Sequence, residues 1–276
     1  DYMIHKKYEK LKQRLKELDN IAIAFSGGVD STFLLYAAKE TLGNNTIAIT
    51  VNASMYPEGE RIDAKHLASQ LGAHHIKIEG KEWEIQGLID NKPDRCYHCK
   101  KAIFTKIKEV AKTNGIEYVA DGTNADDIDD YRPGMKALKE LGIISPLKEV
   151  GLNKEEIRKL SKEFNIPTWD KSSMACLASR IPYGTKITHE NLKMVEKCET
   201  YLLEHGYKGF RVRYHGDIAR IELDPKDIKI FVNSPKIQDL INYFKEVGFT
   251  YITLDLEGYK LGSMNHVLNE KEKLNY

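Results

Sequence analysis

The sequence predicts an α/β protein, in which helices cover a parallel sheet and a smaller α+β domain follows. Short apolar runs alternate with segments of helical period through about residue 170, which is the pattern of βαβ units. From about residue 189 the order changes to a helix, two close strands, a helix and a strand. Because 276 residues exceed a typical single domain, we expect a large domain at 1–185 and a small one at 186–276.

The elements follow one another in the order that a parallel sheet requires. Residues 3–18 have apolar positions at helical spacing, and the apolar run 21–25 after them predicts a buried strand. A segment rich in Ser, Pro and Gly at 171–188 marks the junction between the domains. The same patterns predict helices at 30–42, 58–71, within 82–90 and at 98–113, and strands at 47–51, 75–78, 117–120, 210–214 and 218–223.

The charge and the apolar pattern exclude some classes of protein. Lysine and arginine total 42 against 41 acidic residues, which argues against a surface that wraps nucleic acid, because such surfaces carry a basic excess. The sequence has no run of about eighteen apolar residues, and its N-terminal stretch is rich in Lys and Glu. We therefore expect no membrane span, no signal peptide and a cytoplasmic location.

A glycine-rich loop between the first strand and the next helix predicts a phosphate site. Its residues are Ser26-Gly27-Gly28-Val29-Asp30-Ser31. Backbone N–H groups of such a turn at a helix N-terminus bind anions, and the two glycines let a phosphate approach the backbone closely. The loop lacks the lysine of the GxxxxGK[ST] motif. The plain alternative is a glycine turn that only ends a strand.

This loop resembles the SGGxDS signature of the ATP pyrophosphatase (PP-loop) families, whose members cleave ATP between the α- and β-phosphates. The resemblance implies a Rossmann-like, adenine nucleotide alpha hydrolase-like domain, an adenylated intermediate and release of pyrophosphate. It implies that Ser26 and Asp30 take part in catalysis. It also implies that ATP contacts Ser26, Gly27, Gly28, Asp30 and Ser31.

Two further segments fall where a parallel sheet binds its ligands, beyond the carboxyl ends of its strands. Asn52 ends the second strand, where adenine and ribose contacts are expected. The acidic loop 121–127 follows the fourth strand, so we expect Gly122 and Thr123 to meet the nucleotide and Asp126 to be a candidate Mg²⁺ ligand. The alternative for this loop is a turn with helix-capping Asp and Asn residues.

The four cysteines indicate metal or catalytic chemistry, because a reducing cytosol disfavours structural disulfides. Cys96 and Cys99 lie on one turn, and Cys176 lies in a loop-like stretch. Three thiolates suit a [4Fe–4S] cluster with one iron left open for an extra sulfide. A zinc site with Cys198 or His98 as fourth ligand, a redox pair and unliganded thiols are the alternatives. A helical pattern around Cys198 favours a buried, inert role.

Two arginines in the second domain suggest an anion site. Arg211 and Arg213 alternate on a predicted strand, so their side chains share one face, and two guanidinium groups there suit a phosphate or carboxylates. The alternative is a solvated edge strand with ordinary ion pairs. Glu222 either pairs with these arginines or binds a metal at a subunit contact.

Over essentially its whole length the chain resembles the LarE family of sulfur transferases. Six motifs carry the resemblance: the first is shared with GMP synthetases and tRNA thiolases, whereas the last two are much more specific. The motifs are 26–31, 121–124, Tyr131-Arg132-Pro133-Gly134, 176–184, 211–213 and 219–222.

The resemblance implies a substrate and a reaction. The substrate is pyridinium-3,5-biscarboxylic acid mononucleotide, on the route to the nickel-pincer nucleotide of lactate racemase. Its carboxylate attacks the α-phosphate of ATP, and sulfur then displaces AMP to leave a thiocarboxylate. The implied substrate-binding residues are Arg180, Arg211, Arg213 and Glu222, and Arg180 also joins Cys176 in catalysis. The implied partners are further copies of the chain and downstream nickel-insertion and racemase maturation proteins.

The family has two sulfur sources. One type sacrifices the sulfur of the cysteine that matches Cys176, and the other carries two more cysteines for a [4Fe–4S] cluster with a transferable sulfide. Cys96 and Cys99 place this chain in the second type, with Cys176 as the third ligand.

Other functions make different predictions. A tRNA thiolase would show salt-sensitive tRNA binding and a basic surface. An amidotransferase-type ATP pyrophosphatase would use ammonia and leave the cysteines without a purpose. A non-catalytic nucleotide sensor would bind ATP without releasing pyrophosphate.

Overall fold

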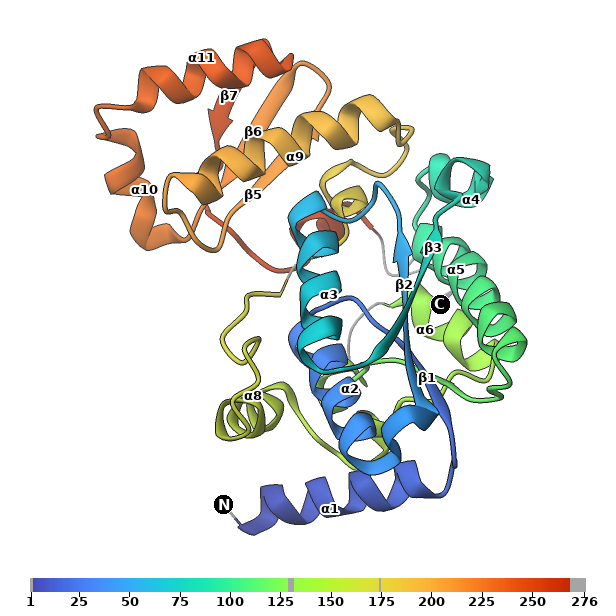
Figure 1. Ribbon diagram of the computed structural model, residues 1–276. Coiled ribbons are helices and arrows are strands. Elements are labelled where there is room, and N and C mark those ends of the chain that lie inside the picture. The colour runs from blue at the N-terminus through green and yellow to red at the C-terminus, as the bar shows by residue number, and fades with distance from the viewer. Residues whose placement is uncertain (1, 129–131, 174, 269–276) are drawn as a thin grey trace. The chain divides into compact units, whose positions relative to one another are not determined.

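The computed structural model describes residues 2–128, 132–173 and 175–268, which form two compact units (Figure 1). The first unit contains residues 1–85 and 96–174, and the second contains residues 86–95 and 175–276. The sequence analysis places a domain boundary between 185 and 186, whereas the compact units divide between 174 and 175. The assignment of ATP and the cluster cysteines to the first domain, and of substrate binding and oligomerisation to the second, stays a prediction.

The segment 86–95 belongs to the second unit because of Asn91. This buried side chain donates hydrogen bonds to the carbonyl oxygens of Ile181, Pro182 and Thr185 at 3.2, 2.7 and 2.9 Å. The backbone N–H of Gly184 donates to the Asn91 carbonyl at 3.0 Å. These contacts span about ninety positions of sequence, which no local pattern reveals.

The first unit contains the predicted parallel sheet. Its strands are β1 (Ile21–Ala24), β2 (Thr46–Asn52), β3 (His74–Glu79) and β4 (Val119–Ala120), in the order β3-β2-β1-β4, and all neighbours run parallel. The α/β class that the sequence predicts is therefore confirmed.

Helices cover both faces of this sheet. Alternate side chains of a strand point to opposite faces, so Ile21 and Ile23 join one hydrophobic core while Ala22 joins the other. The first core includes side chains of α1 (Tyr2–Lys16), α2 (Val29–Leu42) and α3 (Glu58–Gln70), and the second includes those of α5 (Arg95–Thr113). This arrangement buries both faces of β1, as a central parallel strand requires.

The strand order fixes where a ligand binds. The chain builds the sheet outward from β1 through β2 to β3 and then returns to the other side of β1 as β4. The carboxyl ends of β1 and β4 therefore flank a topological switch point, where open α/β sheets bind their ligands. The glycine-rich loop follows β1 and the acidic loop follows β4, so both predicted nucleotide segments lie at this point.

Three helices between β4 and the junction are absent from the sequence-based expectations. They are α6 (Pro133–Glu140), α7 (Pro146–Glu149) and α8 (Lys154–Glu163). The helix expected within 82–90 is a 3₁₀ turn, Glu82–Glu84, followed by the single-turn α4 (Gln86–Ile89). The helix expected at 98–113 begins earlier, at Arg95, so Cys96 and Cys99 both lie in its first two turns.

The second unit is built on a three-stranded sheet, β5 (Arg211–His215), β6 (Ile218–Glu222) and β7 (Tyr251–Leu254), in which β5 and β6 are antiparallel and β6 and β7 are parallel. Its helices are α9 (His189–Glu204), α10 (Pro225–Val232) and α11 (Ile237–Val247), with 3₁₀ turns at Leu177–Arg180 and Ser263–Val267. Side chains of the sheet and of α9 and α11 form its core. Across the residues that the structure describes, no helix has the length and apolar character needed to cross a membrane.

Candidate active site

The loop after β1 folds into a glycine turn at the start of a helix, as the sequence predicts. Gly27 has a φ of +79°, and a Cβ there would lie 3.1 Å from the Ala64 Cα, so glycine is required for both reasons. The Ser31 hydroxyl accepts a hydrogen bond from the Ser26 N–H at 3.2 Å, and the Ser26 hydroxyl accepts one from the Gly28 N–H at 3.3 Å. These bonds close the loop on itself.

The helix that follows this loop is open to a ligand at its N-terminus. Gly28 is the N-cap of α2, and within the described chain it provides no side-chain cap. The first N–H groups of an uncapped helix need partners from outside the helix. Phosphate oxygens satisfy such groups, and the helix dipole adds to the attraction.

The acidic loop after β4 packs directly against the glycine-rich loop. A Cβ on Gly122 would lie 2.9 Å from the Ser31 backbone nitrogen, so glycine permits this approach. The Thr123 hydroxyl donates to Asp121 at 2.6 Å, and the Asn124 side chain donates to Asp30 at 3.2 Å. The acidic loop therefore forms a hydrogen-bonded turn and also lies beside the glycine-rich loop. A turn-forming role and a nucleotide-binding role for this loop are compatible.

Asp30 is held by a residue that the sequence analysis missed. The Lys154 ammonium lies 2.6 Å from the Asp30 Oδ2 atom. Asp30 Oδ1 is buried and accepts no hydrogen bond within the described chain. Burial raises the pKa of the Asp30 carboxyl, while the charge of Lys154 works in the opposite direction. The site thus holds a carboxylate whose ionised form depends on a nearby cation.

Two other predicted residues occupy the expected places. Asn52 ends β2, where its side chain accepts from Arg61 at 2.5 Å and donates to Glu79 at 2.9 Å. Asp126 accepts a hydrogen bond from the Lys154 backbone N–H at 2.9 Å. Both side chains have protein partners, and their roles toward nucleotide and Mg²⁺ stay predictions.

Part of the motif at 131–134 borders the same loop. Tyr131 lies outside the described residues. Arg132 forms an ion pair of 2.6 Å with Asp127 of the acidic loop, and Gly134 leaves room for the Lys100 side chain.

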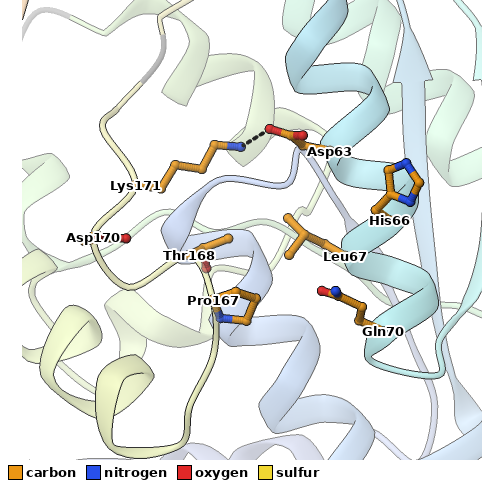
Figure 2. Close-up of a pocket in the computed structure, with 8 residues that line it drawn as sticks. All are labelled: Asp63, His66, Leu67, Gln70, Pro167, Thr168, Asp170 and Lys171. Atoms are coloured by element: carbon orange, nitrogen blue, oxygen red, sulfur yellow. Dashed lines mark ion pairs between the residues drawn. The ribbon is translucent and has the colours of Figure 1, made fainter. Parts of the chain in front are cut away.

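A shallow hollow lies beside α3, near the glycine-rich loop (Figure 2). Its volume is about 390 Å³, and Lys171 on its rim forms ion pairs with Glu60 at 2.8 Å and Asp63 at 3.5 Å. The Lys171 ammonium also donates to the Gly27 carbonyl oxygen at 3.2 Å. Lys171 therefore braces the loop from outside, with its charge balanced by two carboxylates.

The cysteines divide between the two units. Cys96 is exposed and Cys99 is half-buried, both near the start of α5 in the first unit, whereas the half-buried Cys176 precedes the turn Leu177–Arg180 in the second unit. Cys198 is fully buried, and burial raises the pKa of its thiol, which agrees with an inert role. None of the four, all in the described part of the chain, forms a disulfide. Across the described residues, no group of three or more His, Cys, Asp or Glu side chains is arranged around a metal position.

Arg180 fixes the backbone around Cys176. Its guanidinium is fully buried and makes a two-point contact with Glu199, at 2.8 and 2.9 Å. The third nitrogen donates to the carbonyl oxygens of Ala175 and Cys176, both at 3.1 Å. Glu199 is a second residue that the sequence analysis missed, since nothing local links a helical glutamate to an arginine nineteen positions earlier.

The arginines of β5 are buried too, unlike the side chains of a solvated edge strand. Arg213 pairs with Glu222 at 2.9 Å and donates to the Ser179 carbonyl at 3.2 Å. Arg211 lies over the Tyr259 ring at 4.9 Å, and burial, with the charge of Arg180 nearby, lowers its pKa. Together with Arg180 and Glu199 they form a buried region of three arginines against two carboxylates, here called the cationic region of the second unit.

A parallel sheet that presents the Ser26–Ser31 loop at its switch point defines a PP-loop nucleotide-binding protein, and a family model described as a PP-loop domain matches residues 2–92. The chain is 37% identical to the pyridinium-3,5-bisthiocarboxylic acid mononucleotide synthase of Lactiplantibacillus plantarum, over 94% of this chain and 93% of that protein. The chain belongs to the LarE family, that of this synthase, and is an ATP-utilising sulfurtransferase.

Two other relatives show how far the similarity extends. An uncharacterised protein of Synechocystis is 43% identical over 97% of this chain and all of its own length. A glutamine-hydrolysing GMP synthase of Nitratiruptor is 27% identical over 71% of this chain and 42% of its own length. The family that the sequence motifs predict is thus confirmed.

Proposed function

We propose that this chain adenylates a carboxylate of pyridinium-3,5-biscarboxylic acid mononucleotide and converts it to a thiocarboxylate during nickel-pincer nucleotide synthesis. The observation that carries the proposal is the similarity to the L. plantarum synthase over nearly the full length of both chains, with the Ser26–Ser31 loop in place at the switch point. We extend the proposal to a homo-oligomer that passes its product to nickel-insertion and racemase maturation proteins.

The adenylation step follows from the chemistry of the loop. A substrate carboxylate oxygen attacks the α-phosphorus of ATP, the bond from that phosphorus to the bridging oxygen breaks, and pyrophosphate leaves with the electron pair. The N–H groups at the start of α2 and the hydroxyls of Ser26 and Ser31 hold phosphate oxygens. Asn52, Gly122 and Thr123 border the rest of the nucleotide.

The carboxylates beside this loop suit Mg²⁺, which prefers oxygen ligands and substrate phosphates. The buried Oδ1 of Asp30, which accepts no hydrogen bond within the described chain, is available as a ligand, and Asp126 lies on the adjoining loop. The cation would neutralise charge on the departing pyrophosphate. Asp30 and Asp126 would hold it there.

The sulfur donor is the second part of the proposal. Cys96, Cys99 and Cys176 would hold a [4Fe–4S] cluster, which supplies a transferable sulfide when bound. Their thiols are exposed or half-buried and form no disulfide, which supports them as ligands, whereas Cys198 is buried. In the alternative, Cys176 gives up its own sulfur. In both cases sulfur bonds to the acyl carbon and AMP leaves with the oxygen that joined it to the substrate.

The cationic region of the second unit suits the anionic substrate. Glu199 and Glu222 pair with Arg180 and Arg213 and keep them in a fixed orientation, while Arg211 lies over the Tyr259 ring. Arg180 also holds the Cys176 carbonyl, which ties the proposed substrate residues to the proposed sulfur residue.

The experiment is a product assay on protein purified without oxygen, with ATP, Mg²⁺ and the pyridinium substrate. We expect AMP, pyrophosphate and a product in which one oxygen is replaced by sulfur, detected by mass spectrometry. Ammonia-dependent amide formation instead would identify an amidotransferase, and tight tRNA binding that salt abolishes would identify a tRNA thiolase. Either result would overturn the proposal.

A further inference from the structure

The chain that follows β7 returns to the cationic region of the second unit. Gly258 makes this return possible, because its φ is +75° and a Cβ there would lie 2.6 Å from the Leu223 carbonyl oxygen. The next N–H along the chain, that of Tyr259, donates to the same Leu223 oxygen at 2.7 Å. This tight turn brings the segment 259–263 to the arginines of β5.

Tyr259 fixes the plane of the Arg211 guanidinium. The centroid of the tyrosine ring lies 4.9 Å from the Arg211 Cζ atom. Guanidinium groups stack on aromatic faces through their planar, delocalised charge. A ring orients a guanidinium through its face, so the N–H edges stay in the plane in which a phosphate or carboxylate binds. The tyrosine therefore controls the direction in which Arg211 presents its donors.

Ser263 acts on the other arginine of β5. Its hydroxyl accepts a hydrogen bond from Arg213 Nη2 at 3.1 Å and donates one to Glu222 Oε2 at 2.9 Å. The same Arg213 nitrogen donates to Glu222 Oε1 at 2.9 Å. The serine hydroxyl thus bridges the two partners of a buried ion pair and holds the guanidinium at a second point. The segment 259–263 therefore orients both arginines of β5.

We propose that Tyr259 and Ser263 are positioning residues, which set the orientation in which Arg211 and Arg213 bind the anionic groups of the pyridinium nucleotide. The inference rests on the proposed function and adds to it the segment that orients the two arginines. Side chains that are already held in place lose less conformational freedom when a ligand binds, so this positioning raises the affinity for the substrate. The proposed ATP site lies in the first unit, so nucleotide affinity there does not depend on this segment.

The test compares Tyr259→Leu with Tyr251→Leu by calorimetric titration with pyridinium-3,5-biscarboxylic acid mononucleotide and with AMP, both in Mg²⁺. Tyr251 is the matched control, because it lies on β7 of the same unit and its side chain is exposed. We expect Tyr259→Leu to bind the pyridinium nucleotide about 10-fold more weakly and to bind AMP normally, since the variant lacks the ring beside Arg211. Tyr251→Leu should match the wild type with both ligands.

Further variants separate positioning from folding. Tyr259→Phe keeps the ring and should bind the pyridinium nucleotide with wild-type affinity, and thermal unfolding shows whether each variant is folded. Ser263→Ala is a smaller change that keeps the test open if Tyr259→Leu does not fold. It removes the hydroxyl bridge and should weaken binding of the pyridinium nucleotide about 3- to 10-fold.

Three results would overturn the inference. They are wild-type affinity of folded Tyr259→Leu or Ser263→Ala for the pyridinium nucleotide, an equal loss of affinity for AMP, and failure of folded Tyr259→Phe to recover binding. If the wild type bound AMP but not the pyridinium nucleotide, the proposed function itself would be wrong and the inference with it.

Discussion

The predicted sites of the two units consist of different chemical groups. In the first unit the site consists of backbone N–H groups, glycines and hydroxyls that meet at the end of a parallel sheet. In the second unit it consists of buried arginines and carboxylates from separate elements. The first kind is encoded in a short stretch of sequence, whereas the second depends on pairs that only folding brings together. Mutations of the site should therefore lower ligand affinity in the first unit, whereas in the second unit their main effect should be on stability.

The largest effect is expected at the Arg180–Glu199 pair of the second unit. Glu199→Gln removes the charge opposite a fully buried guanidinium, which should lower the free energy of unfolding by about 3–5 kcal/mol. Glu204→Gln, an exposed change on the same helix, should have little effect. Chemical denaturation of the two variants measures the difference. Equal stability would show that this cationic region is not held by its buried pairs.

The next effect is expected at the glycine-rich loop. Gly27 and Gly43 both have a positive φ, so replacement of either by Ala costs about 1–3 kcal/mol. Only at Gly27 would the added Cβ approach another backbone atom, at 3.1 Å. We expect both variants to lose stability and only Gly27→Ala to lose ATP affinity. Titration with ATP separates the two effects. Normal ATP binding by Gly27→Ala would remove the loop from the nucleotide site.

Features encoded in a short stretch of sequence can be predicted, whereas features that depend on distant partners cannot. The Ser26–Ser31 loop and the strands of the parallel sheet follow from local motifs and periodicity, whereas the order of those strands appears only in the structure. The sequence-based expectations lack helix α8, whose start carries a capping signal, Asn153 with Glu156, because its sequence is mostly charged and has few apolar residues to show a period. Lys154, Glu199 and Asn91 act through partners far along the chain, so their roles appear only in the folded structure.

The smallest effect concerns one histidine in each unit. Burial lowers the pKa of His75, assisted by Lys77, and burial with Arg220 lowers that of His215. Each unfolded histidine binds its proton more tightly, so stability is complete above the ordinary pKa of 6.5 and falls as the pH drops toward the folded value.

Replacement of each histidine by Gln should flatten this pH dependence by at most about 1 kcal/mol. Thermal unfolding of the His75→Gln and His215→Gln variants on both sides of pH 6.5 measures it. An unchanged slope in either variant would show that its histidine titrates as it does in the unfolded chain.

The most direct test of the account measures pyrophosphate release and thiocarboxylate formation in Cys99→Ala and Cys198→Ala, both purified without oxygen. Iron and sulfide content is determined on the same samples. The account predicts that Cys99→Ala still releases pyrophosphate with the pyridinium substrate but loses the iron and the sulfur transfer, while Cys198→Ala retains all three. Repeated sulfur transfer by iron-free Cys99→Ala would contradict the account.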